Sequence, residues 1–280
     1  MPVNRHVVSL ALASFFLALP GVQRAAAPAT GQQTPISTRS CFLLFELGVG
    51  QVRRRPSDAC QTRLTPASTF KVPHALAALD AGMIAGPDEQ MPFVDGGGQY
   101  PESARRQHTL ATAIRHSVLW YFQRVAERLG PDREAAYLRK FGFGNMDSTS
   151  QLTTFWIGGS LQISPEEQLA FWLKLYRNEL AVSARALEQV KALLIQPDGV
   201  IVNAAGEQPF ARPWRANTTV SAKTGSATDR SGQAARWLVG YVTQANRSFV
   251  FVSCVIGPRD LAANAAIDLA ARSLREEGVI

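Results

Sequence analysis

The chain has 280 residues, of which 46% are hydrophobic and 18% are charged, a globular composition that suits one large domain or two interlocked subdomains. Its formal net charge is +7, and the densest basic run, at residues 53–55, falls in a predicted turn between short strands. A nucleic-acid-binding surface needs basic residues spread along one face with aromatic residues between them. We therefore expect a solvated loop here and no nucleic-acid partner.

Residues 1–27 have the features of a secretory signal peptide. Arg5 precedes an apolar run at residues 7–19, and the small residues at 25–27 suit cleavage by a signal peptidase. The apolar run is too short for a stable membrane span, and no later stretch is long enough to cross a bilayer. We expect an exported protein without membrane insertion, whose mature domain spans residues 28–280.

Short strands are predicted near the beginning of this domain. Residues 40–47 form an apolar strand, followed by a turn and a partner strand over residues 48–54. Residues 68–83 are predicted to be helical, because Pro73 falls within the first turns, where proline is tolerated. Residues 86–103 are rich in glycine and proline, so we expect them to run irregularly over the surface.

From residue 109 to residue 195 the apolar residues recur with the period of a helix. The period then changes to that of strands, and an amphipathic helix over residues 260–278 closes the chain. The three predicted strands are 218–225, 235–244 and 247–257. The pattern predicts an antiparallel sheet covered by the last helix, with a helical subdomain at roughly 85–210 inserted into this α/β part. A cleft between the two parts would hold the site.

The three cysteines are an odd number. In an oxidising compartment Cys41 and Cys60 could bridge the first strand to the segment before Ser68, a pairing that the sequence leaves open. Cys254 lies in an apolar strand and is predicted to be a buried free thiol. Because the spacings do not fit a zinc site, we expect no metal.

Ser68 and Lys71 stand three residues apart at the start of a predicted helix, and therefore on one helix face. A serine hydroxyl becomes a good nucleophile when a nearby base takes its proton, and lysine can be that base only when its amine is neutral or modified. The helix N-terminus would stabilise negative charge on the serine oxygen. Taken alone, the pair also fits an ordinary helix cap, because serine starts many helices.

Two further motifs favour chemistry. Lys223-Thr224-Gly225 lies on a predicted strand, where Gly225 leaves room for a substrate while Lys223 and Thr224 offer a cation and a hydroxyl to a carboxylate. Ser117 stands at a break between two predicted helices, from which it can point into the same cleft. The order S-x-x-K, then serine, then K-T-G is typical of serine–lysine acyl transfer.

In these residues the sequence resembles the penicillin-recognising serine enzymes and, within them, the class D (oxacillinase-type) β-lactamases. The similarity covers about residues 40–280. It rests on five segments in the family's order: PASTFK (66–71), HSVL (116–119), FGFGN (141–145), FWIGGSLQIS (155–164) and AKTG (222–225). The resemblance implies an α/β (α+β) fold, with an antiparallel β-sheet flanked by N- and C-terminal helices and an all-helical subdomain.

The resemblance also implies a mechanism. Ser68 would attack the carbonyl of a β-lactam and form an acyl-enzyme, with the backbone N–H groups of Ser68 and Ser226 as the oxyanion hole. Lys71 would be carboxylated by CO2, the one cofactor expected, and would then be the general base. Trp156 and Leu119 would support this carbamate, Trp156 through its indole N–H.

Other family residues would handle the leaving group and the substrate. By resemblance, Ser117 relays a proton toward the leaving nitrogen with help from Lys223. Thr224 helps to bind the substrate carboxylate, and Gly225 belongs to the same substrate-binding strand.

The sequence departs from the family's pattern at three places. Leu119 stands where the family often has valine, and Phe143 replaces the commoner tyrosine. The arginine that usually binds the substrate carboxylate is missing, since Ala266 takes its place. Arg259 is the expected substitute, with Arg230 as the second choice.

A glutamate base, which related enzymes of class A use, is not expected here. Glu166 and Glu167 follow Ser164 and Pro165, and this order reads as a helix start in which Ser164 and Glu167 form a capping box. None of the histidines in the mature domain has the support of a catalytic triad, and His74 is expected to be packed in the core.

Three functions remain in competition. The favoured one is a periplasmic β-lactamase that hydrolyses penicillins and related antibiotics and confers resistance. The others are a β-lactam sensor domain that is acylated once, and a cell-wall transpeptidase or carboxypeptidase. Both alternatives commonly carry a membrane segment, an anchor or an extra domain, none of which the sequence predicts. The sequence indicates neither the substrate spectrum nor the oligomeric state.

Overall fold

The computed structural model describes residues 1, 36–55, 58–95 and 97–280. Apart from residue 1, the predicted signal peptide lies outside these ranges, and the described residues 36–38 form no part of the expected N-terminal flanking helix. The described residues from 36 to 280 belong to one compact unit. In the described ranges no helix is long and apolar enough to span a membrane.

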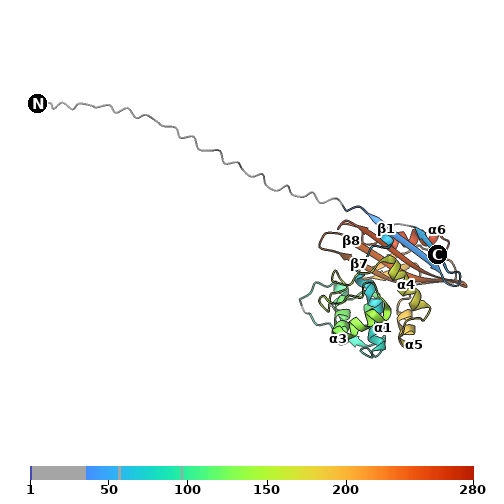
Figure 1. Cartoon of the computed structure of the whole chain (residues 1–280), viewed down its shortest axis with the longest axis horizontal. Helices are drawn as coiled ribbons and strands as arrows, with labels where there is room; N and C mark the ends of the chain where they lie inside the picture. The colour runs from blue at the N-terminus through green and yellow to red at the C-terminus, as the bar shows by residue number, and fades with distance from the viewer. Residues whose placement is uncertain (2–35, 56–57, 96) are drawn as a thin grey trace. The chain divides into compact units, whose positions relative to one another are not determined.

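Strands from the two ends of the chain form a five-stranded antiparallel sheet in the order β2-β1-β9-β8-β7 (Figure 1). The strands are β1 (Arg39–Glu46), β2 (Gln51–Arg55), β7 (Thr218–Thr228), β8 (Ala234–Gln244) and β9 (Arg247–Gly257). β1 pairs with β9 along its whole length, with Cys41 opposite Cys254. This pairing brings the first strand into the middle of the sheet and leaves β7 at one edge.

Helices cover both faces of this sheet, which is why its central strands are almost continuously apolar. Side chains alternate between the faces of a strand, so Leu238 belongs to the core under one face and Trp237 to the core under the other. α6 (Ala265–Glu276) packs on the Leu238 side, with Ile267, Ala270 and Leu274 buried. α4 (Pro165–Tyr176) packs against β1, β8 and β9 on the opposite side.

The remaining helices form a second layer beside the sheet (Figure 1). They are α1 (Lys71–Asp80), α2 (Leu110–Arg115), α3 (Leu119–Phe141) and α5 (Ala184–Leu193), with short 3-10 helices at η1 (Asp58–Cys60), η2 (Ala67–Phe70) and η3 (Glu102–Ala104). The fold also contains two small two-stranded antiparallel sheets. One pairs β3 (Gln90–Met91) with β4 (His108–Thr109), and the other pairs β5 (Val200–Asn203) with β6 (Gly206–Pro209). α3 is kinked where Gly130, with φ of +74°, precedes Pro131.

Most elements predicted from the sequence are present within a few residues of their predicted bounds, and three details differ. Residues 53–55, predicted in a turn, lie on β2 because the strand continues beyond the tight turn at residues 47–50. The helix predicted from residue 68 begins as η2 and becomes α-helical at Lys71. Residues 200–209, inside the range predicted for the helical subdomain, form the β5–β6 hairpin.

The pairing of the cysteines, which the sequence left open, is resolved. Cys41 and Cys60 form a disulfide, with their Cα atoms 5.1 Å apart, that ties β1 to η1 just before the Ser68 segment. Cys254 is a buried free thiol, as predicted, and burial raises the pKa of its thiol.

Candidate active site

A glycine lets the Ser68 segment pack against the edge strand β7. A Cβ atom at Gly225 would lie 2.8 Å from the Pro66 carbonyl oxygen and 3.0 Å from the Thr69 side chain. Only glycine therefore allows η2 to come this close to the strand. The sequence suggested that the space beside Gly225 admits a substrate, but the Ser68 segment fills that space on this side of the strand. Gly225 still lines the cavity in front of Ser68.

Lys71 and Ser68 form a hydrogen-bonded pair at the junction of η2 and α1. The distance between Lys71 Nζ and Ser68 Oγ is 2.7 Å, and the lysine is only 1% exposed. Burial among apolar side chains disfavours the ammonium form and lowers the pKa of Lys71 to about 7. A neutral amine beside a serine hydroxyl is the arrangement that a lysine base requires.

Ser117 and Lys223 form a second pair across the site. Lys223 Nζ on β7 lies 2.9 Å from Ser117 Oγ, which stands between α2 and α3. Ser117 has a φ of +57°, in the left-handed region that non-glycine residues seldom occupy. Burial, and secondly the charge of Lys71, lower the pKa of Lys223 well below its ordinary value.

The two pairs meet at a cavity of about 260 Å³. Its walls come from η2, the α2–α3 break, β7, the β5–β6 turn and the beginning of α6. The lining residues are Ser68, Ser117, Asn203, Ala204, Ala205, Thr224, Gly225, Ser226, Trp237, Ala263 and Ile267. Five of the residues predicted for the site therefore share one opening.

Other predicted site residues lie elsewhere. The two buried amines of Lys71 and Lys223 are behind the cavity wall, each bonded to a serine that lines it. Leu119 is the first residue of α3 and packs, half-buried, against the larger core. Arg259 is exposed, with its guanidinium 3.9 Å from where a Cβ of Gly232 would stand, and does not line the cavity. Arg230 lines a separate surface hollow.

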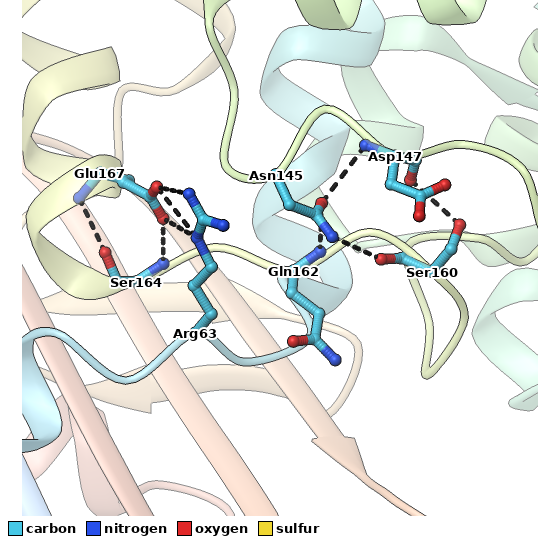
Figure 2. Close-up of polar contacts among 7 residues, drawn as sticks. All are labelled: Arg63, Asn145, Asp147, Ser160, Gln162, Ser164 and Glu167. Carbon is cyan, nitrogen blue, oxygen red and sulfur yellow. Dashed lines mark hydrogen bonds and ion pairs between the residues drawn. The ribbon is translucent and has the colours of Figure 1, made fainter.

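The loop at residues 142–164 carries Trp156 and is fastened at both ends (Figure 2). At one end the Asn145 side chain donates to the Ser160 carbonyl and accepts from the Gln162 N–H. At the other end Ser164 and Glu167 form the predicted capping box of α4, and Glu167 also binds Arg63. Glu167 thus has the local structural task that the sequence predicted.

Hydrogen bonds to the Trp156 backbone carbonyl connect this loop to the segment before Ser68. The Trp156 carbonyl accepts from the Ala67 N–H at 3.0 Å and from the Thr65 hydroxyl at 2.9 Å. The Trp156 ring is completely buried, with its centroid 5.7 Å from that of Phe70, the neighbour of Lys71. Its indole N–H has no hydrogen-bond partner among the described residues.

An unpaired buried donor costs about 1–3 kcal/mol, so an acceptor placed beside the indole N–H would stabilise this region. An acidic group attached to the Lys71 amine would supply one within the same apolar surroundings. The residues present therefore fit a carboxylated lysine: a buried amine that is easily deprotonated, and an unpaired donor on Trp156, whose ring packs against Phe70, the neighbour of Lys71 in the chain.

Sequence reasoning missed two parts of the site. The β5–β6 turn and the residues before α6 carry no motif, and their contribution depends on tertiary packing alone. The second part is the partner of His74, which is hydrogen-bonded to Glu134 inside the core. His74 is packed in the core, as expected; a carboxylate holds its ring, but in the described part of the chain no serine bonds to its Nδ1, so the pair is not a catalytic triad. A glutamate among apolar residues of a helix was the available signal.

Comparisons with known proteins agree with this geometry. The sequence profile of the penicillin binding protein transpeptidase domain matches residues 29–275. The protein named "Probable beta-lactamase YbxI" of Bacillus subtilis (strain 168) is 32% identical over 244 residues, which cover 87% of this chain and 82% of that protein. The regulatory protein BlaR1 of Bacillus licheniformis is 33% identical over 219 residues, 78% of this chain but only 33% of BlaR1.

A solved structure shows the same fold. The crystal structure of a class D β-lactamase from Bacillus subtilis superposes with a TM-score of 0.73 at 30% sequence identity. The superposition covers 87% of this chain and 93% of that one.

Proposed function

This chain belongs to the penicillin-binding-protein transpeptidase family and, within it, to the class D serine β-lactamases, and on that premise we propose that it opens the β-lactam ring of penicillins and related antibiotics through an acyl-enzyme at Ser68. The observation that carries the proposal is the 2.7 Å hydrogen bond between Ser68 Oγ and the buried Lys71 amine. Export to the periplasm and antibiotic resistance are parts of the same proposal.

Acylation needs the Ser68 proton to leave as the bond to carbon forms. The Lys71 side chain accepts this proton while Ser68 Oγ attacks the carbonyl carbon of the lactam. The backbone N–H groups of Ser68 and Ser226, both residues of the cavity wall, hold the developing oxyanion. The C–N bond of the strained ring then breaks.

The ring nitrogen must receive a proton when that bond breaks. Ser117 lines the cavity and is hydrogen-bonded to Lys223, so its hydroxyl passes a proton to the nitrogen and is resupplied by the lysine. Thr224 lines the same wall and binds the substrate carboxylate through its hydroxyl. Gly225 lines the cavity next to Thr224, so its backbone borders the bound substrate.

Lys71 is proposed to be N-carboxylated by CO2, with no other cofactor or metal. When present, the carbamate supplies the general base. The chain's own residues prepare for it: burial lowers the pKa of the Lys71 amine to about 7, so that it is readily deprotonated, and Trp156 offers an unpaired N–H. Leu119, at the first turn of α3, limits access of water to this region from the helical side.

A second candidate follows from the similarity to BlaR1, whose name describes a regulatory protein. A sensor would keep its acyl group, whereas a hydrolase releases it. The test is a chromogenic cephalosporin mixed with purified enzyme, with mass spectrometry of the protein during and after the reaction. We expect many turnovers per enzyme and no lasting adduct; one stoichiometric adduct on Ser68 that persists for hours would favour the sensor. Undiminished hydrolysis by Ser68→Ala would overturn both.

A further inference from the structure

A buried histidine and a buried glutamate lie next to the Lys71 site and have no part in the steps above. The His74 side chain is 0% exposed and that of Glu134 is 2% exposed, and His74 Nε2 is hydrogen-bonded to a Glu134 carboxylate oxygen. His74 stands on α1 three residues after Lys71, and Glu134 stands on α3. The pair therefore connects α1, which carries Lys71, to α3.

His74 shares its aromatic neighbours with Lys71. Its ring centroid lies 5.0 Å from Trp156 and 6.0 Å from Phe122. Lys71 Nζ lies 5.6 Å from the centroid of the same Phe122 ring. Phe70 contacts both His74, at 4.8 Å, and Trp156, at 5.7 Å. The lysine amine, the imidazole and the indole thus border one buried region.

Electroneutrality of the buried pair favours the forms in which Nδ1 carries a hydrogen. A carboxylate beside a neutral imidazole would leave an uncompensated buried charge, which costs several kcal/mol. In the ion pair, with Glu134 ionised, both nitrogens of His74 carry hydrogen. In the neutral pair, the Glu134 hydroxyl donates to Nε2 and the ring hydrogen is on Nδ1. Both neutral forms place a hydrogen on Nδ1.

Two N–H donors are consequently unpaired in the same region. His74 Nδ1 and Trp156 Nε1 are buried and have no hydrogen-bond partner among the described residues. Each unpaired donor costs about 1–3 kcal/mol, which an anion placed between them would recover. A group of this region that can become an anion by a known route is the Lys71 amine: its nitrogen bonds to the carbon of CO2 and releases one proton to solvent.

We propose that His74 is a positioning residue that donates its Nδ1–H, together with the Trp156 indole N–H, to the CO2-modified side chain of Lys71. Glu134 holds the imidazole in the protonation state and orientation that this donation needs. The inference rests on the proposed function, because it requires that Lys71 be carboxylated.

Substituting His74 by asparagine or by glutamine tests the two imidazole nitrogens one at a time. The asparagine amide reaches the place of Nδ1, whereas the glutamine amide reaches the place of Nε2. Glu134→Gln is added to both variants so that no unpaired carboxylate remains in the core. The comparison is His74→Asn with Glu134→Gln against His74→Gln with Glu134→Gln.

The measured quantity is the fraction of Lys71 that is carboxylated. It is monitored through the 13C NMR signal of the carbamate while 13C-labelled bicarbonate is added to the full chain. We expect the asparagine variant to reach half-occupancy within about threefold of the native bicarbonate concentration. We expect the glutamine variant to need at least about tenfold more, the equivalent of one lost hydrogen bond to a charged group. Equal occupancy in the two variants would overturn the role of Nδ1.

Two further variants complete the test: one that keeps the core packed without the polar pair, and one control at a different buried histidine. His74→Phe with Glu134→Leu replaces the pair by apolar groups of similar shape, a change that buried pairs usually tolerate, and it should lose carbamate affinity as the glutamine variant does. His108→Gln is the matched control, because His108 is also buried but has both nitrogens bonded, to Thr112 and Ser103, away from Lys71. It should leave occupancy unchanged.

The outcome also separates this inference from the proposed function. A carbamate signal in the native protein that persists in the His74→Phe variant would overturn the inference and leave the lysine base intact. No signal in a native protein that still hydrolyses β-lactams would overturn both the carboxylated base and the role of His74.

Discussion

Lys223 Nζ lies 2.9 Å from Ser117 Oγ, although 106 residues separate the two in the sequence. The contact joins the edge strand of the sheet to the break between α2 and α3. Ser117 reaches it from a left-handed backbone conformation, with φ of +57°, which costs about 1–2 kcal/mol for a residue other than glycine. Because the neighbouring helices fix this conformation, the hydroxyl is held in place before any substrate arrives.

Ser117→Ala should slow acylation and leave the fold intact. The variant removes the hydroxyl that carries a proton to the leaving nitrogen, and loss of one general acid–base group typically costs about 10²- to 10⁴-fold. The acylation rate is measured by stopped flow with a chromogenic substrate. Thr219→Ala, a polar-to-alanine change at an exposed position of β7, is the control and should act as the native enzyme does. Acylation at the native rate would remove Ser117 from the mechanism.

Activity should fall as the pH is lowered through about 7. The pKa of Lys71 is lowered to about 7 by burial, so the amine is neutral above that pH and protonated below it. Only the neutral amine accepts a proton or reacts with CO2. Added bicarbonate should therefore restore activity near pH 6 to 7 in degassed enzyme, and Lys71→Ala should not respond. Full activity in CO2-free buffer at pH 8 would contradict the carboxylated base.

The same lysine should make the fold more stable as the pH rises. In the unfolded chain lysine keeps its ordinary pKa of 10.5, whereas the folded-state pKa is about 7. Between these values the unfolded chain binds one more proton, so the free energy of unfolding increases with pH by up to about 1.4 kcal/mol per unit. Urea unfolding in CO2-free buffer at pH 7, 8 and 9 measures this slope. Lys71→Met should lack this contribution and be more stable at pH 7; equal slopes in the two proteins would contradict a lysine that is neutral in the fold.

The sequence predicted the parts of the site that depend on local order. Ser68 and Lys71 are neighbours through three residues of helix, and the capping box of Ser164 and Glu167 is equally local, so both could be read from spacing. The sheet was predictable because its strands have the period and apolar content of buried β-structure. The sequence could not place Arg259, because the direction of a loop side chain depends on contacts made only after folding.

The burial of His74 and Glu134 is a further case of tertiary order. Each is a buried polar residue of its own helix, and only the packing of α1 against α3 makes them a pair. Similarly, the reason for Gly225 was misjudged, because the sequence does not tell that Pro66 faces it.

Trp156→Phe should acylate but release the acyl group slowly. Phenylalanine keeps the edge-to-face contact with Phe155 and removes the N–H that the modified lysine needs. We expect deacylation to slow by at least about tenfold, the loss of one hydrogen bond to an anion, and acyl-enzyme to accumulate in the mass spectrum. Trp172→Phe is the matched control, since Trp172 is equally buried with an unpaired N–H but lies on α4. Slow deacylation in both variants would point to packing as the cause.

Binding of the substrate carboxylate should depend on Thr224 and not on Arg259. Of the described residues, those lining the cavity include Thr224 but no arginine, and the Arg259 side chain is exposed beside Gly232. Arg236 is closer along the sheet, opposite Ser226 on β8, but its guanidinium is buried and donates to three backbone carbonyls.

A hydrogen bond to a charged group contributes about 1.5–3 kcal/mol, so Thr224→Val should raise KM by about tenfold or more. Arg259→Ala should change KM by less than about twofold, as expected for an exposed charge outside the site. KM values for a penicillin and for a derivative with an esterified carboxylate test the point, because the ester should lose the effect of Thr224→Val. A large rise in KM for Arg259→Ala that also disappears with the ester would show that the loop after β9 turns its arginine into the cavity when substrate binds.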